Sequence, residues 1–183
     1  MSIQEHTSAD TSLNQISAGL RYAVRNGLIK PNSVNLDIGG GKFNQGIEYV
    51  ETCVPSSRLL IYDKYNRSEE NNSNVLNKAK FICRYVGIHN TLNVVKEVEV
   101  RADILDDAKN FMTSNGVVHI TIYEGDKTGN SRQSKQDRGR GSSWQEHRTI
   151  ESYLAEIKEI FPESAYEIVL KRKNILITQK YRG

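Results

Sequence analysis

Cysteine and proline are scarce in this chain, whose 183 residues include two cysteines, Cys53 and Cys83, and three prolines. Two isolated cysteines are too few for a disulfide framework or a CxxC-type zinc site, so we expect reduced thiols and no metal. No apolar run approaches the roughly 20 residues of a membrane-spanning helix, and residues 1–10 lack the basic and apolar regions of an export signal. These absences predict a cytoplasmic protein without a membrane segment.

The remaining composition is that of one folded domain. Hydrophobic residues make up 37% of the chain and charged residues 26%, which is enough apolar material for a buried core. No internal repeat and no linker divides the sequence. We therefore expect a single domain over residues 1–183.

The spacing of apolar residues predicts an alternation of helices and strands. Helical spacing predicts helices over 12–29, 44–53, 67–80, 96–116 and 143–161, and apolar runs predict strands over 34–39, 57–63, 81–90, 117–125, 166–172 and 174–180. Such an alternation predicts an α/β fold, a three-layer αβα sandwich around a mainly parallel, doubly wound sheet. The tight turn near Lys173 predicts a C-terminal hairpin that adds one antiparallel strand.

A glycine-rich loop follows the first predicted strand, in the segment VNLDIGGGKFNQG at residues 34–46. Glycines let the backbone turn sharply and approach a ligand, and the start of the next helix offers free N–H groups. Ligands of parallel sheets bind at the carboxyl ends of the strands, where this loop is expected. The loop therefore predicts a nucleotide-like ligand, with a tight turn that binds nothing as the alternative.

The residues around the glycines distinguish three classes of ligand. A Walker-type phosphate loop needs Ser or Thr where Phe43 stands, and a dinucleotide fingerprint needs a third glycine where Asn44 stands. Asp37 would repel a pyrophosphate, but it suits a cationic cofactor such as S-adenosylmethionine, which carries a sulfonium and an ammonium. Asp63, about 20 residues further on, is placed to bind ribose hydroxyls of either kind of cofactor.

Four segments, LDIGGGKF, YDKYNRS, NTLNVV and ITIYEGDKTG, follow one another in the order seen in a known family. The sequence resembles small class I, Rossmann-like methyltransferases of phage or plasmid type. The resemblance implies S-adenosylmethionine as the cofactor and places Asn90 nearest to its methyl group. On this resemblance and the loop chemistry, the cofactor-binding residues are Asp37, Gly39, Gly40, Gly41, Asp63 and Asn90.

The sequence also departs from the family pattern. The motif DxGxGxG ends on Phe43 in place of its last glycine, and only one helix fits between Asp63 and the third predicted strand, so one strand and one helix of the family core are missing. No DPPY-like motif is present, and the catalytic residues are left unassigned. For His89 and His119, each alone in an apolar run, we expect core or strand positions and no catalytic role.

Positive charge is concentrated in one polar stretch. Residues 127–148 hold six Lys or Arg and two acids, a net charge of +4, whereas the whole chain carries +3. A basic loop over 127–143 is therefore expected beside the ligand site, where it could hold nucleic-acid phosphates while an aromatic ring stacks on a base. The candidate substrate-binding residues are Tyr123, Lys127, Arg138, Arg140 and Trp144. A solvated loop with incidental charge is the alternative.

The leading hypothesis is methyl transfer from S-adenosylmethionine to an unidentified substrate, with nucleic acid as one candidate. Such a reaction asks mainly for alignment of donor and acceptor and needs no metal. A second hypothesis is a non-catalytic, methyltransferase-like module that contacts nucleic acid or a host protein. A third, an NAD-type oxidoreductase, is disfavoured by Asp37 and Asn44.

Overall fold

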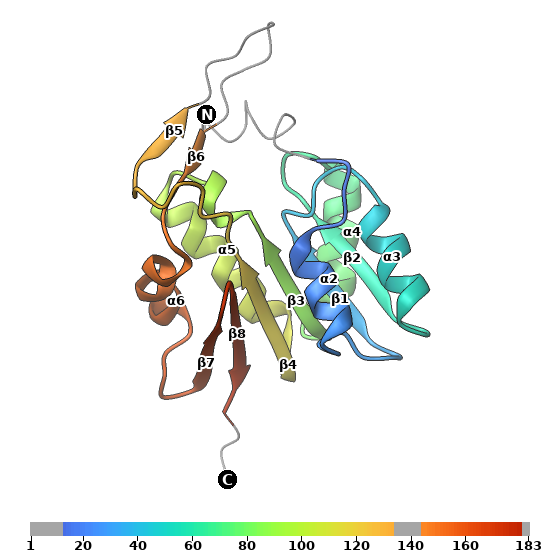
Figure 1. Ribbon diagram of the computed structural model, residues 1–183. Coiled ribbons are helices and arrows are strands. Elements are labelled where there is room, and N and C mark those ends of the chain that lie inside the picture. The colour runs from blue at the N-terminus through green and yellow to red at the C-terminus, as the bar shows by residue number, and fades with distance from the viewer. Residues whose placement is uncertain (1–12, 134–143, 181–183) are drawn as a thin grey trace, which may run out of the picture.

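The structure of this chain is a computed structural model that describes residues 13–133 and 144–180. Its elements follow the predicted alternation of helices and strands (Figure 1). In chain order they are α2 (Ala18–Arg25), β1 (Val34–Ile38), α3 (Gln45–Cys53), β2 (Arg58–Tyr62), α4 (Glu69–Ala79), β3 (Cys83–His89), η1 (Leu92–Val94), α5 (Val98–Phe111), β4 (Met112–Thr121), β5 (Ser131–Gln133), β6 (Trp144–Glu146), η2 (Ile150–Tyr153), α6 (Leu154–Ile160), β7 (Tyr166–Lys171) and β8 (Asn174–Gln179).

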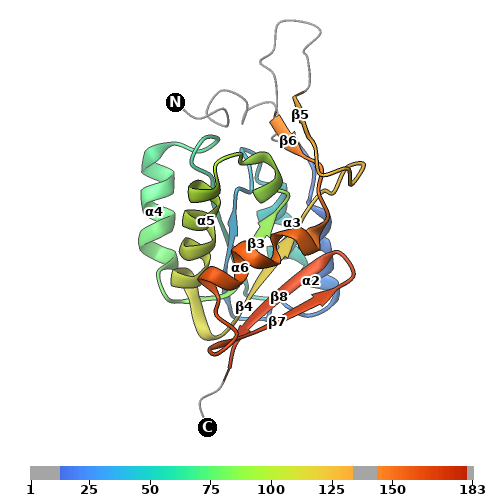
Figure 2. The ribbon, with the colours of Figure 1, turned by 90° about the vertical axis from the view of Figure 1, so that its left-hand side faces the viewer.

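Six of the strands form one sheet in the order β2-β1-β3-β4-β8-β7. Strands β1 to β4 run parallel, and β8 pairs antiparallel with both β4 and β7. Helices α4, α5 and α6 pack on one face of the sheet, and α2 and α3 pack on the other (Figure 2). The predicted three-layer sandwich with one antiparallel strand is confirmed. Only α4 lies between β2 and β3, so β2 is an edge strand of this sheet.

The two faces of the sheet differ in chemistry because successive strand residues point to opposite sides. Leu36, Val86 and Ile120 belong to the large apolar core beneath α4, α5 and α6. Their neighbours in sequence alternate to the α2 face and include Asp37 and His119, both buried. The register sets Asp37 opposite Gly87, and Gly87 opposite His119, so the middle of one row across this face carries two polar side chains on either side of a glycine.

The predicted helix over 12–29 is wrong in its bounds, because α2 covers only Ala18–Arg25. It begins at Ser17, whose hydroxyl accepts a hydrogen bond from Leu20 N at 3.1 Å, a standard N-cap contact. It ends before Gly27, whose φ of +65° leaves the helical region. Ser12, the expected cap, lies outside the described residues.

Two other helix bounds were also wrong. The helix expected over 96–116 ends at Phe111, because Met112 is extended and starts β4, in which it pairs with Cys83. The helix expected over 143–161 does not begin at its predicted start, because residues 144–146 form β6 and pair with β5. Strand β5 of this hairpin lies within the predicted basic loop 127–143, and β6 follows directly after that loop. Among the described residues, no helix is long and apolar enough to cross a membrane.

Candidate functional site

A cleft of about 810 Å³ opens at the carboxyl ends of β1, β2 and β3. Residues 16–18 before and within α2, part of α5, and residues 144–145 of β6 complete its walls. The structure brings all the predicted cofactor-binding residues to this one cleft: Asp37, Gly39, Gly40, Gly41, Asp63 and Asn90 all line it. The cleft therefore has the position that ligands take in open α/β sheets.

The glycine loop presents bare backbone to the cleft. Gly39 and Gly41 both have a φ of +76°, a region that L-residues with side chains rarely adopt. A Cβ at Gly39 would overlap the Thr91 hydroxyl, and one at Gly40 would lie 2.9 Å from Asp37 Oδ2. A side chain at either position would thus meet an occupied wall of the cleft.

Asp63 and Arg67 hold this loop from the end of β2. Asp63 Oδ2 accepts a hydrogen bond from Gly41 N at 2.8 Å, while Oδ1 accepts bonds from the backbone N–H groups of Tyr65 and Asn66. Arg67 Nε donates to the carbonyl oxygen of Gly41, also at 2.8 Å. Asp63 Oδ2 keeps acceptor capacity for a ligand, because a carboxylate oxygen can accept two hydrogen bonds.

Sequence reasoning missed Arg67. Its guanidinium also donates to the carbonyl oxygen of Phe43 and to Asn44 Oδ1, each at 2.8 Å. One side chain thus bonds three successive parts of the loop, which a planar fork with five N–H groups allows. The only signal in the sequence was its position four residues after Asp63, in the segment YDKYNRS.

Asp37 lies at the base of the cleft with only 4% of its surface exposed. Within the described part of the chain, no group donates a hydrogen bond to its carboxyl. Burial, and beyond it the negative charge of Asp63, raises the pKa of Asp37 to about 8. The carboxyl is therefore mostly protonated at neutral pH unless a cation lies beside it, and a bound cation would favour its ionised form.

The charge of the cleft is predominantly negative. Its lining contains four carboxyl groups and one ammonium group, those of Asp37, Asp63, Asp103, Asp107 and Lys64. Burial and the neighbouring acids Asp103 and Asp106 raise the pKa of Asp107. Such a surface attracts cationic groups and disfavours phosphates.

A hydrogen-bonded chain of buried polar side chains runs from the cleft across the α2 face of the sheet. The Tyr85 hydroxyl lies 2.8 Å from His89 Nε2 and 3.0 Å from His119 Nδ1. At the two ends, His89 Nδ1 lies 3.0 Å from Thr121 Oγ1, and His119 Nε2 lies 2.8 Å from Asn174 Oδ1. His119 is a strand histidine, as expected, whereas His89 also lines the cleft.

The predicted substrate-binding residues are only partly gathered at the cleft. Tyr123, 55% exposed, and the buried Trp144 line it, whereas the Lys127 ammonium lies 3.1 Å from Glu124 Oε2 in an ion pair. Arg138 and Arg140 lie outside the described residues.

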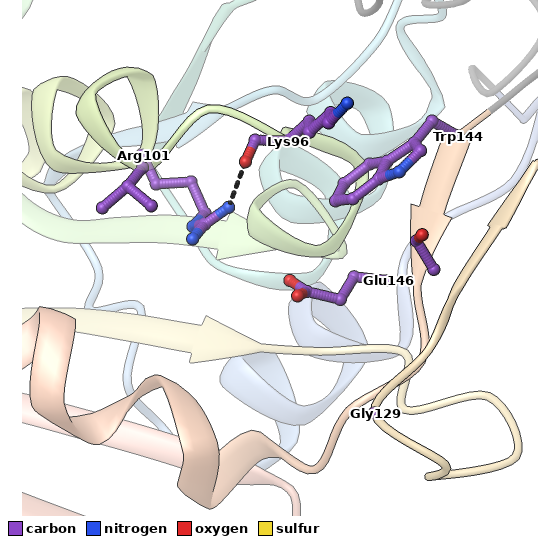
Figure 3. A pocket seen from close by; sticks show the side chains of 7 residues that line it. Lys96, Arg101, Gly129, Trp144 and Glu146 are labelled. Carbon is purple, nitrogen blue, oxygen red and sulfur yellow. Dashed lines mark hydrogen bonds between the residues drawn. The ribbon is translucent and has the colours of Figure 1, made fainter.

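Trp144 also lines a second, smaller pocket of about 600 Å³ beside the β5–β6 hairpin (Figure 3). Arg101 in this pocket donates to the Lys96 carbonyl oxygen at 2.9 Å and forms an ion pair with Glu156 at 2.7 Å. These bonds tie α5 to α6 and to the segment after η1, so this guanidinium has a structural role.

No family model matches the sequence, and no curated protein matches it by sequence. The fold is nevertheless shared with solved structures. One from Rhodobacter sphaeroides, named as that of putative Zn-dependent alcohol dehydrogenases, is 11% identical with a TM-score of 0.59, and the match covers 98% of this chain and 97% of that one. An S-adenosylmethionine-dependent methyltransferase from Aquifex aeolicus is 12% identical with a TM-score of 0.53, over 95% of this chain and 96% of its own.

The glycopeptide N-methyltransferase MtfA, in complex with S-adenosylmethionine, is 9% identical with a TM-score of 0.55, over 90% of this chain and 93% of its own. At these identities the likeness concerns the fold alone. The chain has the Rossmann-like fold of methyltransferases, in which an antiparallel C-terminal strand pair extends a parallel sheet.

Proposed function

We propose that this protein binds S-adenosylmethionine in the cleft and transfers its methyl group to an acceptor. The observation that carries the proposal is Asp37, a buried carboxyl to which none of the residues that the structure describes donates a hydrogen bond, directly before a loop of bare backbone. A cationic ligand would compensate the buried charge, whereas the pyrophosphate of a dinucleotide would add to it. The fold shared with MtfA, whose structure contains this cofactor, supports the same ligand.

Each residue of the site has a proposed part. The Asp37 carboxylate would hold a positively charged part of the cofactor, the backbone of Gly39 to Gly41 would let it approach, and Asp63 Oδ2 would accept a bond from a ribose hydroxyl. When bound, the cofactor supplies a methyl group already activated by a positive sulfur. The chain then needs to align an acceptor about 3 Å from that methyl group, and Asn90 is the proposed neighbour of the transfer.

Calorimetric titration tests the cofactor. At pH 7 in buffers of different ionisation enthalpy, we expect S-adenosylmethionine to bind with release of about one proton, because the cation ionises Asp37. Asp37→Asn should bind more weakly and release none, while Asp103→Asn, at the exposed rim, serves as the matched control. Binding of NAD in place of S-adenosylmethionine would overturn the proposal. S-adenosylhomocysteine lacks the sulfonium, so its proton release tells which cationic group faces Asp37.

The methyl acceptor is a separate proposal. The basic segment over 127–143 and the cleft-lining aromatics Tyr123 and Trp144 support nucleic acid, although the cleft itself carries four carboxyl groups. A gel-shift experiment at low salt with single-stranded and duplex oligonucleotides decides, and absence of a shift would remove this acceptor. The non-catalytic alternative predicts cofactor binding without transfer of a tritiated methyl to any of DNA, RNA, protein or small metabolites. Origin from a phage or plasmid and a cytoplasmic location stay predictions.

A further inference from the structure

The hydrogen-bonded chain behind the cleft has a definite direction, which starts from Asn174. Its Nδ2 donates to the Lys171 carbonyl oxygen at 3.3 Å, so its Oδ1 faces His119 as an acceptor. His119 Nε2 must therefore carry a proton, and in a neutral imidazole Nδ1 is then the acceptor. Nδ1 receives the hydroxyl proton of Tyr85, which fixes the first half of the chain.

The second half follows from the single proton of a tyrosine hydroxyl. Because Tyr85 donates to His119, its oxygen accepts from His89 Nε2–H, and His89 Nδ1 is left as the acceptor of the Thr121 hydroxyl. Every donor in the chain thus points away from the cleft. His89 Nδ1 is the accepting end of the chain, its bond to Thr121 is half-buried whereas the bond of Nε2 is buried, and His89 itself lines the cleft.

Two glycines make room for this arrangement. Tyr85 and His89 are four residues apart on one strand, with Gly87 between them on the same face. A Cβ at Gly87 would lie 2.6 Å from His89 Nε2 and 3.1 Å from the Tyr85 oxygen. A Cβ at Gly19 of α2 would overlap the His89 ring. Strand β3 and helix α2, which covers it, therefore each have a glycine where a side chain would collide with the His89 ring.

The chain is neutral at physiological pH, because both of its histidines are weaker bases than a free imidazole. Burial lowers the pKa of His119 to about 4, although the bond to Asn174 favours its charged form, and burial lowers the pKa of His89 well below its usual value. The titratable groups that face the chain from neighbouring elements are Asp37 on β1 and Tyr22 on α2, whose ring centre lies 5.4 Å from that of His119.

We propose that His89 accepts the proton that the methyl acceptor loses, and that Tyr85 relays it to His119. This inference rests on the proposed methyl transfer. In that step a lone pair of the acceptor forms the bond to the methyl carbon, the carbon–sulfur bond breaks, and its electron pair goes to sulfur. The acceptor's proton reaches His89 Nδ1 either through the Thr121 hydroxyl, which passes its own proton to Nδ1, or directly once that hydroxyl has turned away. Nε2 then passes its own proton to Tyr85, and Tyr85 passes its proton to His119 Nδ1.

The relay makes a specific structural prediction. After one proton has entered, His119 is an imidazolium, and His89 has changed from the Nε2–H to the Nδ1–H tautomer. The Asn174 amide does not accept a proton, so the chain stores one proton and returns it to the cleft after the products leave. His89 is thus the residue that takes the proton from the acceptor, and Tyr85 and His119 act only through His89.

NMR of protein labelled with ¹⁵N at histidine tests this without a methyl acceptor. On titration from neutral pH into acid, we expect His119 to become charged near pH 4 and His89 to change tautomer in the same step. In Tyr85→Phe, which keeps the ring, the His119 titration should leave the tautomer of His89 unchanged. The signals of His147, outside the chain, serve as the internal control. A charged His89 before His119, or unlinked titrations in the wild type, would overturn the relay.

A second variant keeps the test within the pH range of the folded protein. Asn174→Asp places a negative charge beside His119 and should move the coupled change to higher pH by about 1 to 3 units. If His119 shifts in this variant while His89 keeps its tautomer, the relay is wrong. Failure of the calorimetric titration would instead remove the cofactor and leave the tautomer result intact, so the two proposals fail separately.

Discussion

The two faces of the sheet differ in the side chains that the central strands present: one face is apolar, and the other carries the buried polar groups of the proposed site. Toward α4, α5 and α6 the central strands present residues such as Leu36, Ile88 and Val118, which pack into one apolar core. Toward α2 the same strands present Asp37, His119 and other buried polar groups. Buried polar groups cost stability unless they are bonded or charge-compensated. The α2 face carries this destabilising term at the cleft, and the larger apolar core on the opposite face contributes most of the compensating burial.

The largest expected effect is a loss of stability when a side chain of the apolar face is shortened. Leu105 of α5 is fully buried in that core, so Leu105→Ala should lower the free energy of unfolding by about 2 to 5 kcal/mol. Urea denaturation measures the change. Cofactor affinity of the remaining folded protein should be unaltered, and a large loss of affinity would show that the two faces are not separable.

The pH dependence of stability isolates Asp37 on the polar face. Its pKa is raised in the folded state, so the native protein retains a proton that the unfolded chain releases above about pH 4. Its contribution to stability is full at lower pH, falls by at most about 1.4 kcal/mol per pH unit as the pH rises toward 8, and is constant above. Urea unfolding from pH 5 to 9 should therefore show the wild type losing stability relative to Asp37→Asn. Parallel curves for the two proteins would contradict the raised pKa.

Gly39→Val tests whether the glycine loop of the cleft binds a ligand or is only a tight turn. The positive φ and the overlap with Thr91 predict a moderate loss of stability, about 1 to 3 kcal/mol, together with loss of S-adenosylhomocysteine binding. Thermal melting and calorimetry on the same preparation separate the two effects. Normal affinity in a destabilised protein would identify the loop as a simple turn.

Asp63→Ala should weaken cofactor binding by about 1 to 3 kcal/mol, the range for hydrogen bonds to a charged group. The variant also frees Gly41 N, so part of this loss comes from a looser loop. Arg67→Met is the matched comparison, because it loosens the same loop without removing the proposed ribose acceptor. Equal losses in the two variants, measured by calorimetry, would assign Asp63 to the loop alone.

The smallest expected effect concerns the basic loop. Replacing Arg138 and Arg140 together by Ala should leave cofactor affinity unchanged and flatten the salt dependence of any nucleic-acid binding. Each lost phosphate contact lowers the slope of log K against log salt by about 0.9 on duplex and 0.7 on single strands. Filter binding over a salt series measures this, and an unchanged slope would leave the arginines without a role in binding.

The sequence predicted what depends on local pattern, namely the alternation of elements, the reversed terminal strand and the glycine loop with Asp37. It failed where tertiary contacts override local spacing. Trp144 lies in a strand because it pairs with β5, although the spacing of apolar residues after it predicts a helix. The hydrogen bonds between Tyr85, His89 and His119 could not be predicted from the sequence, because only the register of β3 against β4 brings these side chains together.

One residue of the cleft also gives the molecule a built-in spectroscopic probe. Trp144 is the only tryptophan in the sequence, and its indole lines the cleft as well as the smaller pocket beside it. Fluorescence excited selectively at tryptophan therefore reports from a single position at the proposed site, with no label attached. Rapid mixing with a ligand would then measure the rates of ligand association and dissociation from the change in this emission.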